Sequence, residues 1–347
     1  MPARGRAQAV SFDVAFVGAG WATRERHVPA FRRDARVRLR GVVDLHGDRA
    51  EALARAEKLE HWGSSLDEPW LDGVDAIVVG VPPLAHGDVV EAVLDLGAHC
   101  LCEKPFVLPA ERARTLVERA EGAGLTLAVV HNFQFSVAGR RLFGLVESGE
   151  LGRVVAVYGF QLSNRARRLP HWADTLPGGL FLDEAAHLLY LQRRVLGRLD
   201  PRLVDARVVD GEIVHLTATL DDDEIWSTLA MSFESSVSEW QLVVVGERAT
   251  AAFDLFRDVL VVLPNDGQHR GREVLRSSAA LVGRHVAGVA ASGTRLARGR
   301  LHYGNDEVAR RFVDGALGDA SRLEGISGRD GVAVVEALER LLALAGL

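Results

Sequence analysis

The feature that most constrains this fold is an alternation of short apolar runs with helical segments through the first 130 residues. The apolar runs cover 12–17, 37–43, 76–81, 98–102 and 125–130, and the helical segments cover 22–33, 47–59, 86–96 and 110–121. Strands that alternate with helices of 10–15 residues predict a parallel sheet covered on both faces. We therefore predict a doubly wound, dinucleotide-binding parallel sheet for residues 1–131.

A glycine-rich turn follows the first apolar run. Gly18 and Gly20 allow a tight turn and let the backbone approach a pyrophosphate at a helix N-terminus. Thr23 stands where a third glycine or alanine is usual. Asp44 ends the second strand about 20 residues further on, where an acid accepts hydrogen bonds from the adenosine ribose. Because that acid would repel a 2′-phosphate, the sequence favours NAD over NADP. Asp44 is equally suited to cap the next helix.

The second half has a different pattern. Strand-like segments cover 154–162, 203–209, 213–220, 224–233, 239–245, 250–256 and 259–263, with a turn at 221–223 and helices at 137–148, 180–191, 307–317 and 329–344. Polar alternation in 213–220 is typical of an antiparallel sheet with one open face. For residues 132–347 we predict an α+β domain on a large, open, mostly antiparallel sheet that binds substrate and a second subunit.

Lys104 is unusual because the chain has 41 basic residues and only two of them, Lys58 and Lys104, are lysine. A lysine is a compact charge that arginine does not replace. Lys104 follows a buried strand, whereas Lys58 lies in a helical run and reads as a surface residue. Asp183 and His187 are four residues apart in a predicted helix, so they share one face. A histidine there can move a proton near neutral pH, with a carboxylate beside it. A plain surface pair is the alternative.

Composition excludes several classes of protein. The formal net charge of −6 gives no reason to expect a nucleic-acid partner, and no apolar run suits a signal peptide or a membrane span. Cys100 and Cys102 are spaced for buried thiols rather than a disulfide, which favours a reducing cytoplasm. Asp183 and His187 supply only two ligands, so no metal site is predicted.

Taken together, the chain resembles the Gfo/Idh/MocA family, which includes glucose–fructose oxidoreductase and inositol dehydrogenase. The resemblance rests on the glycine turn, Val81-Pro82-Pro83-Leu84-Ala85-His86, Glu103-Lys104-Pro105, Gly149-Glu150-Leu151-Gly152, and Gly178-Gly179 with Asp183 and His187. It implies that Lys104, Asp183 and His187 meet beside the nicotinamide, with a proline that is often cis. The cofactor-binding residues expected from the turn and the resemblance are Gly18, Gly20, Trp21, Ala22, Asp44, Val81, Pro82, His86, Glu103, Lys104 and Asn132.

Three positions depart from the family pattern. Gln134 replaces an arginine, Ala185 replaces a glycine, and Tyr190 replaces an acid three residues after the histidine. These changes leave the chemistry intact and put the substrate's identity in doubt. The run Leu169-Pro170-His171-Trp172 is expected to line the same pocket, and a packing role for Trp172 is an equal alternative.

The resemblance implies an NAD-dependent oxidoreductase that interconverts a secondary alcohol and a ketone on a sugar, aminosugar or cyclitol, as a homodimer or homotetramer. His187 would be the general acid/base, Lys104 would hydrogen-bond the reacting oxygen, and Asp183 would position substrate or His187. Two alternatives remain open: redox-neutral, NAD-dependent glycoside cleavage, and a non-enzymatic dinucleotide-binding regulator.

Residues 265–300 have no counterpart in this resemblance. They hold seven arginines against Asp266 and Glu273. Apolar residues recur at spacings of 4, 3, 4 and 3, which predicts a basic amphipathic helix: Leu275, Ala279, Val282, Val286 and Val289. Such a helix would pack one face on its own domain, contact another subunit or bind a phosphorylated substrate.

Overall fold

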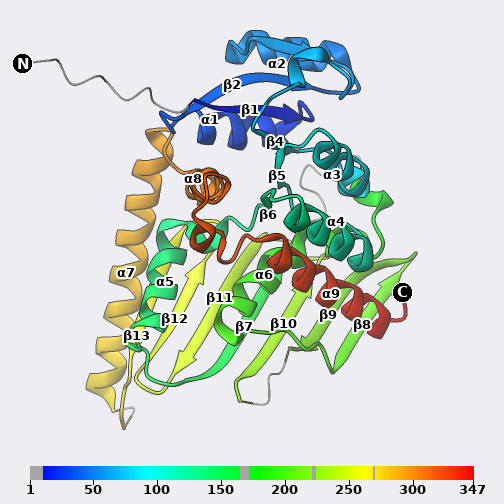
Figure 1. The fold of residues 1–347 in the computed structure, drawn as a ribbon. Helices are drawn as coiled ribbons and strands as arrows, with labels where there is room; N and C mark the ends of the chain where they lie inside the picture. Colours follow the sequence, from blue (N-terminus) through cyan, green and yellow to red (C-terminus); the bar gives the residue numbers. More distant parts are fainter. Residues whose placement is uncertain (1–10, 165–171, 221–223, 269) are drawn as a thin grey trace, which may run out of the picture. The chain divides into compact units, whose positions relative to one another are not determined.

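The computed structural model describes residues 11–164, 172–220, 224–268 and 270–347, and it divides into two compact units (Figure 1). The first unit contains the chain to Glu103 together with Thr115–Val130 and Asp306–Ser327. The second contains Lys104–Arg114, His131–Asn305 and Gly328–Leu347. Compared with the predicted division after residue 131, Lys104–Arg114 belongs to the second unit and Asp306–Ser327 belongs to the first. Neither unit is continuous in sequence.

The first unit is built on a six-stranded parallel sheet in the order β3-β2-β1-β4-β5-β6. The strands are β1 (Phe12–Val17), β2 (Val37–Val43), β3 (His61–Gly63), β4 (Ala76–Val79), β5 (His99–Cys102) and β6 (Leu127–Val129). This confirms the predicted doubly wound sheet. The order reverses between β1 and β4, and in such sheets ligands bind outside the carboxyl ends of the strands at that reversal.

Helices of the first unit follow the predicted segments, with one difference. They include α2 (Gly47–Glu57), α3 (His86–Asp95) and α4 (Ala110–Gly122), whose last residues belong to this unit. The segment predicted as one helix over 22–33 consists of a π-helical turn, Thr23–His27, followed by the short helix α1 (Val28–Phe31). The short edge strand β3 was not predicted, because three residues are too few to show a period.

A late segment of the chain completes the core of the first unit. Helix α8 (Asn305–Ala316) brings Phe312, whose ring packs edge-on against Phe31 at 6.2 Å, and Phe31 packs in turn against Phe16 of β1 at 6.1 Å. All three rings are fully buried. The backbone of Val129 in β6 also donates to the carbonyl of Ile326 at 2.7 Å. These contacts explain why residues near 310 belong with the first sheet.

The second unit is built on a seven-stranded sheet in the order β13-β12-β11-β7-β10-β9-β8. Its strands are β7 (Val154–Leu162), β8 (Val204–Val209), β9 (Glu212–Thr219), β10 (Trp226–Ser232), β11 (Glu239–Gly246), β12 (Ala249–Asp254) and β13 (Val259–Pro264). Among the strands in the described part of the chain, β7 and β10 are the one parallel pair in this sheet. The predicted mostly antiparallel sheet is therefore confirmed. The turn predicted at 221–223 lies outside the described residues.

Helices cover one face of this sheet. They are α5 (Val137–Glu147), α6 (Leu180–Leu196) and α9 (Gly328–Leu344), and their apolar residues form one core with the inward residues of the strands. The other face carries partly exposed side chains at alternate positions, such as Tyr158 and Phe160 on β7. Among the described residues, no helix is long and apolar enough to cross a membrane.

The predicted basic helix is present as α7 (Gly271–Ala297), which runs along β13 (Figure 1). It touches its own unit through Gly288, where an added Cβ would lie 2.6 Å from Val259, and through Arg295, which pairs with Asp258 at 3.0 Å. The predicted apolar stripe does not face β13. Leu275 is 72% exposed and Val286 is 61% exposed.

Replacing Phe312 by alanine tests the assignment of α8 to the first unit. We expect the variant to lose about 3–5 kcal/mol of stability, because a fully buried ring leaves a cavity. Amide hydrogen exchange measured by mass spectrometry should then speed up in β1 and β2 and stay unchanged in β7 and β11. Faster exchange confined to the second sheet would contradict the assignment. Leu317→Ala, at a half-exposed position just after α8, serves as the control and should have little effect.

Candidate active site

The turn after β1 leaves no room for side chains. Gly18 has a φ of +93°, and a Cβ on it would lie 2.5 Å from the carbonyl oxygen of Gly80, just after β4. Glycine is therefore needed at position 18 for two reasons: its φ lies in the left-handed region, and the backbone of Gly80 approaches it closely. The two turns come together at the strand-order reversal, where a ligand is expected.

Thr23 shows how the imperfect glycine pattern is accommodated. Its hydroxyl donates to the carbonyl of Gly18 at 2.6 Å. A Cβ on Gly80 would lie 2.6 Å from that same hydroxyl oxygen. The glycine that sequence patterns place at position 23 is thus replaced by a threonine, and Gly80, just after the adjacent strand β4, provides the space. Gly80 was missed from the sequence because its need arises from a contact across strands.

Asp44 is held in position beside this turn. Its Oδ2 accepts a hydrogen bond from the backbone of Ala19 at 2.7 Å, and its Oδ1 accepts one from the backbone of His46 at 2.9 Å. The alternative role as a helix cap is wrong, because the N-cap of α2 is His46 and, among the described residues, no side chain caps that helix; the Asp44 carboxylate instead links the glycine turn to the residue before α2. A carboxylate keeps further lone pairs on each oxygen for ligand hydroxyls.

The remaining cofactor candidates of the first unit fall into two groups. Trp21 is 61% exposed, and the guanidinium carbon of Arg26 lies 4.9 Å from the centre of its ring. Ala22, near the turn after β1, and Val81 and Pro82, in the turn after β4, are half-buried or exposed. His86 is fully buried, and its Nε2 lies 3.0 Å from the carbonyl of Val81. The geometry thus gives His86 the task of fixing the turn after β4.

Glu103 directly follows β5, and its carboxylate lies 2.9 Å from Nε2 of His27. The His27 side chain is only 3% exposed, and that of Glu103 is 16% exposed. This contact, which the sequence did not reveal, joins the helical turn after β1 to the end of β5. Burial raises the pKa of the Cys100 thiol on the same strand, so Cys100 is an unreactive core residue.

In the second unit, Lys104 and Asp183 form an ion pair. The Lys104 Nζ lies 2.5 Å from Asp183 Oδ1 and 3.3 Å from the Asp183 carbonyl oxygen. Both side chains are mostly buried, at 16% and 18% exposure. Asp183 lies in the first turn of α6, which begins after Gly179 with a φ of +65°. The Lys104–Pro105 peptide bond is cis, as the resemblance implied.

His187 lies one turn further along α6, in a cluster of aromatic rings. Phe133 packs edge-on against its imidazole at 5.0 Å, and Trp240 lies against it at 5.2 Å. His187 is only 7% exposed. Phe133 and Trp240 come from η4 (Phe133–Phe135) and β11, so the cluster joins three distant parts of the sequence.

The partner of His187 is Tyr190, the residue that departs from the family pattern. The Tyr190 hydroxyl lies 3.1 Å from His187 Nδ1, accepts the backbone N–H of Phe133 at 3.0 Å, and lies 3.5 Å from Asn132 Oδ1. Its ring stacks on His131 at 4.5 Å. Spacing could have indicated this role, since residues three apart on a helix are neighbours.

Three features lower the pKa of His187 well below its usual range: burial first, then the positive charge of Lys104, then His131. His187 is therefore neutral at physiological pH. The folded state disfavours its protonated form, whereas the unfolded chain protonates near pH 6.5. This histidine accordingly reduces stability as pH falls below about 6.5 and has no such effect above it.

Three other predicted positions are engaged inside the second unit. Asn132 donates from Nδ2 to the carbonyl of Tyr303 at 2.9 Å, and its Oδ1 lies 3.5 Å from the Tyr190 hydroxyl. Gln134 is buried, donates to the His131 carbonyl at 3.0 Å and accepts from Arg194 at 3.2 Å. Trp172 packs against the core, which favours its packing role. Residues 169–171 lie outside the described part of the chain.

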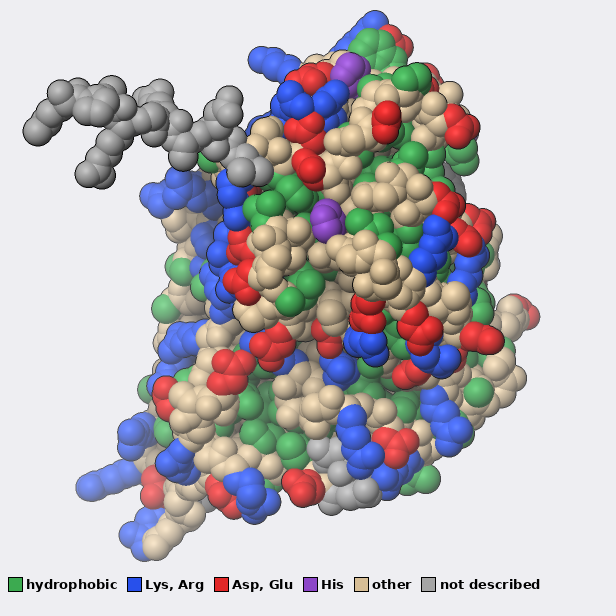
Figure 2. All heavy atoms as spheres, viewed as in Figure 1, with side chains coloured by type: hydrophobic (Ala, Val, Ile, Leu, Met, Phe, Trp, Pro, Cys, Tyr) green, Lys and Arg blue, Asp and Glu red, His purple; other side chains and the backbone are tan. Residues whose placement is uncertain are grey.

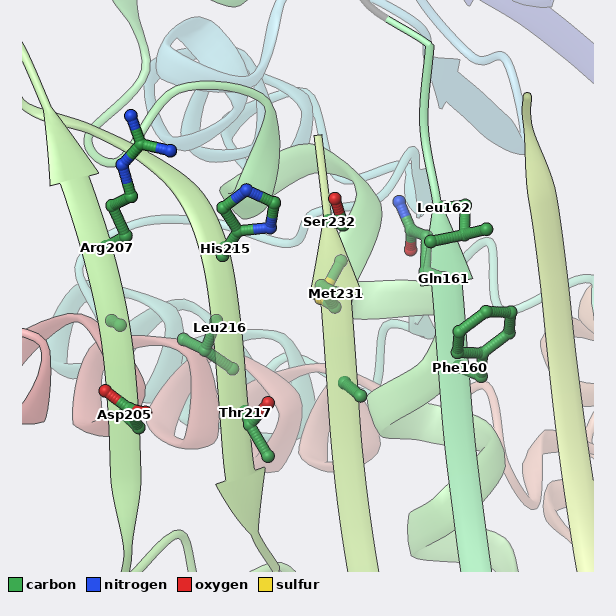
Figure 3. A pocket seen from close by; sticks show the side chains of 12 residues that line it. Phe160, Gln161, Leu162, Asp205, Arg207, His215, Leu216, Thr217, Met231 and Ser232 are labelled. Atoms are coloured by element: carbon green, nitrogen blue, oxygen red, sulfur yellow. The ribbon is translucent and has the colours of Figure 1, made fainter. Parts of the chain in front are cut away.

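A separate groove of about 350 Å³ lies on the sheet face opposite α6 (Figure 3). Phe160 of β7, Arg207 of β8 and His215 of β9 line it. Arg207 and His215 both contact Glu234, each at 3.0 Å. None of the predicted site residues lines this groove. Within the described residues, no group of three or more His, Cys, Asp or Glu side chains could hold a metal ion.

Comparison with known proteins identifies the first part of the chain. Residues 12–131 match the family model described as "Oxidoreductase family, NAD-binding Rossmann fold". A D-xylose 1-dehydrogenase (NADP(+)) of Haloferax volcanii is 36% identical over 135 residues, which cover 37% of this chain and 40% of that protein. A scyllo-inositol 2-dehydrogenase (NAD(+)) of Bacillus subtilis is 28% identical over 163 residues, 45% of each chain. The matches thus span less than half of these relatives.

Solved structures extend the similarity to the whole chain. GenD2 from gentamicin A biosynthesis, solved in complex with NAD, matches with a TM-score of 0.76 and 23% identity over 99% of this chain and 97% of its own. At that identity the comparison shows a common fold for both units, and no common substrate follows from it.

Titration of His187 tests the electrostatic description of the site. We expect its pKa, measured by NMR on the whole protein, to lie well below 6.5 and to rise in Lys104→Gln, because that change removes the nearest positive charge. Lys58→Gln is the matched control, since Lys58 is the only other lysine and is exposed at the end of α2. A His187 pKa near 6.5 in the wild type, or an equal rise in both variants, would contradict the description.

Proposed function

We propose that this chain belongs to the Gfo/Idh/MocA family of oxidoreductases, whose model matches residues 12–131, and that it interconverts a secondary alcohol and a ketone on a sugar, aminosugar or cyclitol, using NAD. The observation that carries the proposal is the Lys104–Asp183 ion pair placed one helical turn from a neutral, buried His187. The relatives support a small polyol or sugar substrate by the names they bear.

The turns after β1 and β4 fit a dinucleotide. A Cβ on Gly18 would fill the space beside Gly80, and the Asp44 carboxylate is oriented by two backbone N–H groups next to the glycine turn. Such a turn brings backbone N–H groups to a pyrophosphate. Bound there, the nicotinamide dinucleotide supplies the hydride acceptor or donor.

His187 handles the proton in this proposal. Its Nδ1 is engaged by Tyr190, so Nε2 is the ring nitrogen that exchanges a proton with the substrate hydroxyl. To accept that proton at Nε2, the neutral ring must carry its own hydrogen on Nδ1, which donates to the Tyr190 oxygen while the tyrosine hydroxyl donates to Asn132 Oδ1. A neutral histidine is already in the form that accepts a proton, and positioned acid/base groups contribute about 10²–10⁴-fold in rate.

Lys104 stabilises the reacting oxygen. An alcohol that loses a hydride passes through partial alkoxide character, and an ammonium group beside it lowers that cost. Asp183 holds the ammonium at 2.5 Å and fixes its direction. The chain runs from β5 through Glu103 directly into Lys104, so the cation comes two residues after the carboxyl end of a strand in the sequence.

The open face of the second sheet supports a subunit contact in this proposal. Tyr158, Phe160 and Trp226 are 42%, 38% and 53% exposed there, and exposed apolar patches mark interaction sites. Tyr158→Asp should reduce the assembly seen by light scattering at micromolar concentration. A monomeric wild-type chain would refute the contact.

Substitution of the two proposed groups tests the reaction. Lys104→Ala and His187→Ala should each lower kcat by roughly 10²–10⁴ and leave NAD affinity within a few-fold of wild type. Lys104→Arg should fail too, because the guanidinium is larger, planar and always charged. Lys58→Arg is the control and should retain full activity.

The same assay separates the alternatives. Reduction of NAD with a panel of polyols and sugars supports the dehydrogenase, and glycoside cleavage without net NADH would replace it with the redox-neutral reaction. If Lys104→Arg retained full activity, the assignment of the site would be wrong. If only His187→Ala remained active, Lys104 would be the proton carrier.

Cofactor preference follows from Asp44. Because its carboxylate lies beside the glycine turn, a 2′-phosphate would be repelled, and we expect NAD to bind more tightly than NADP. Asp44→Ala should narrow the difference in affinity between NAD and NADP, mainly by strengthening NADP binding. Fluorescence titration with both cofactors measures it, and Asp48→Ala in the next helix is a charge-matched control. Equal affinity in the wild type would overturn this role for Asp44.

A further inference from the structure

Helix α7 turns an apolar stripe away from its own unit. Its inner face is marked by Gly288, which approaches Val259 of β13, by Arg295, which pairs with Asp258 just before that strand, and by the buried Ser292. At 100° per residue, Val274 and Leu281 lie toward the inner face, and the opposite face carries five other large apolar side chains of the helix. Their exposed fractions are 72%, 59%, 61%, 40% and 65% for Leu275, Val282, Val286, Val289 and Leu296.

The stripe has the period of a helix–helix seam. Positions 275, 279, 282, 286, 289, 293 and 296 alternate steps of four and three, which is the a/d pattern of a coiled coil over three heptads. The residues are Leu, Ala, Val and Gly, without the Trp and Phe that interfacial membrane helices use. A two-position seam is also narrower than the broad apolar face of a lipid-bound helix.

Two glycines in α7 have no explanation within this chain. A Cβ on Gly283 or Gly293 would meet nothing within 4 Å, whereas one on Gly288 would meet Val259. A glycine inside an exposed helix costs about 1 kcal/mol relative to alanine. Gly288 is required by packing on β13, whereas close approach of a second backbone would account for Gly283 and Gly293.

The stripe is complementary to itself when two copies run antiparallel. In such a pair an a position faces a d position of the other helix. Aligning Leu275 with Gly293 of a second copy also aligns Val289 with Ala279 and Val282 with Val286. In the central turns, each large side chain then faces either a small residue or a valine of the other helix. Exchanging the two helices leaves the same set of pairs, as a twofold symmetric contact requires.

We propose that α7 is a self-association helix, which packs antiparallel against α7 of a second copy of this chain. The alignment also separates like charges. Arg276 falls beside Ala290 of the other helix, and Arg284 lies on the side away from the seam. The proposal does not depend on the enzymatic activity, and it concerns a different surface from the open sheet face.

Figure 2 shows Lys and Arg side chains along the margin where Figure 1 draws α7. Among the described residues, Arg276 and Arg284 make no ion pair. These charges would attract an anionic lipid surface as well, so a membrane is the competing occupant that the experiment must address.

The expected affinity follows from the size of the seam. From Leu275 to Leu296 it is about 32 Å long at 1.5 Å per residue and one helix, about 10 Å, wide. That is smaller than the roughly 800 Å² per partner of a standard interface. We therefore expect reversible association in the micromolar range, which would convert monomers to dimers, or dimers held through the sheet to tetramers.

A cysteine pair tests both the contact and its direction. Leu275→Cys with Gly293→Cys places two thiols about 27 Å apart along one helix, so no disulfide can form within a chain. The antiparallel pair brings each thiol to the other kind on the second copy, and mild oxidation should give a covalent dimer on non-reducing gels. Native Cys100 and Cys102 are buried and serve as an internal control. Leu275→Cys alone should not cross-link; if it does and the double variant gains nothing, the helices pair in parallel and the proposal is wrong.

A charge placed in the seam tests the contact in solution. Val286→Asp should shift sedimentation equilibrium to half the wild-type mass at micromolar concentration, and Ala291→Asp, exposed on another side of the same helix, should not. Equal masses for all three proteins would overturn the proposal. So would binding of wild type, and not Val286→Asp, to phosphatidylserine vesicles without any difference in mass, because that result assigns α7 to a lipid surface.

Discussion

The ion pair between Lys104 and Asp183 is the interaction on which the rest of the site depends. A lysine so little exposed needs a partner, since an unpaired buried charge costs several kcal/mol. Asp183 supplies it at 2.5 Å from the first turn of α6. That pairing allows a cation to remain near His187, whose pKa it lowers. Loss of Asp183 would remove the carboxylate that pairs with Lys104, the cation that lowers the pKa of His187, so substitutions at these residues should not be additive.

The parts of the site that follow local patterns could be predicted from the sequence. The glycine turn, the strand ending at Asp44, and the four-residue spacing of Asp183 and His187 each depend on one segment and its period. The aromatic cluster around His187 could not. Phe133, Trp240 and Tyr303 are separated by up to 170 residues and meet only in the folded unit. Their packing removes water from the imidazole, which is why the largest cause of its lowered pKa was invisible in the sequence.

Periodicity predicts a face but not what the face touches. The spacing of Leu275 through Val289 correctly predicted an amphipathic helix, and the simplest expectation placed its apolar side on its own domain. The structure places glycine, serine and arginine there instead. The same limit applies at β1, where Thr23 could be noticed as a departure from a glycine pattern but Gly80, which makes room for it, lies just after another strand.

The two neutral substitutions near His187 belong together physically. The pattern that the sequence resembles has an arginine at the position of Gln134 and an acid at the position of Tyr190, whereas both residues are neutral here. Burying a charge pair costs desolvation that neutral hydrogen bonds avoid. Gln134 bonds to the His131 carbonyl and to Arg194, and Tyr190 bonds to the backbone of Phe133, so both replacements are satisfied within the second unit. An acid beside His187 would favour its protonated form, and a tyrosine does not. The consequence is a histidine that stays neutral over a wider pH range, in a site whose remaining charges are concentrated on Lys104 and Asp183.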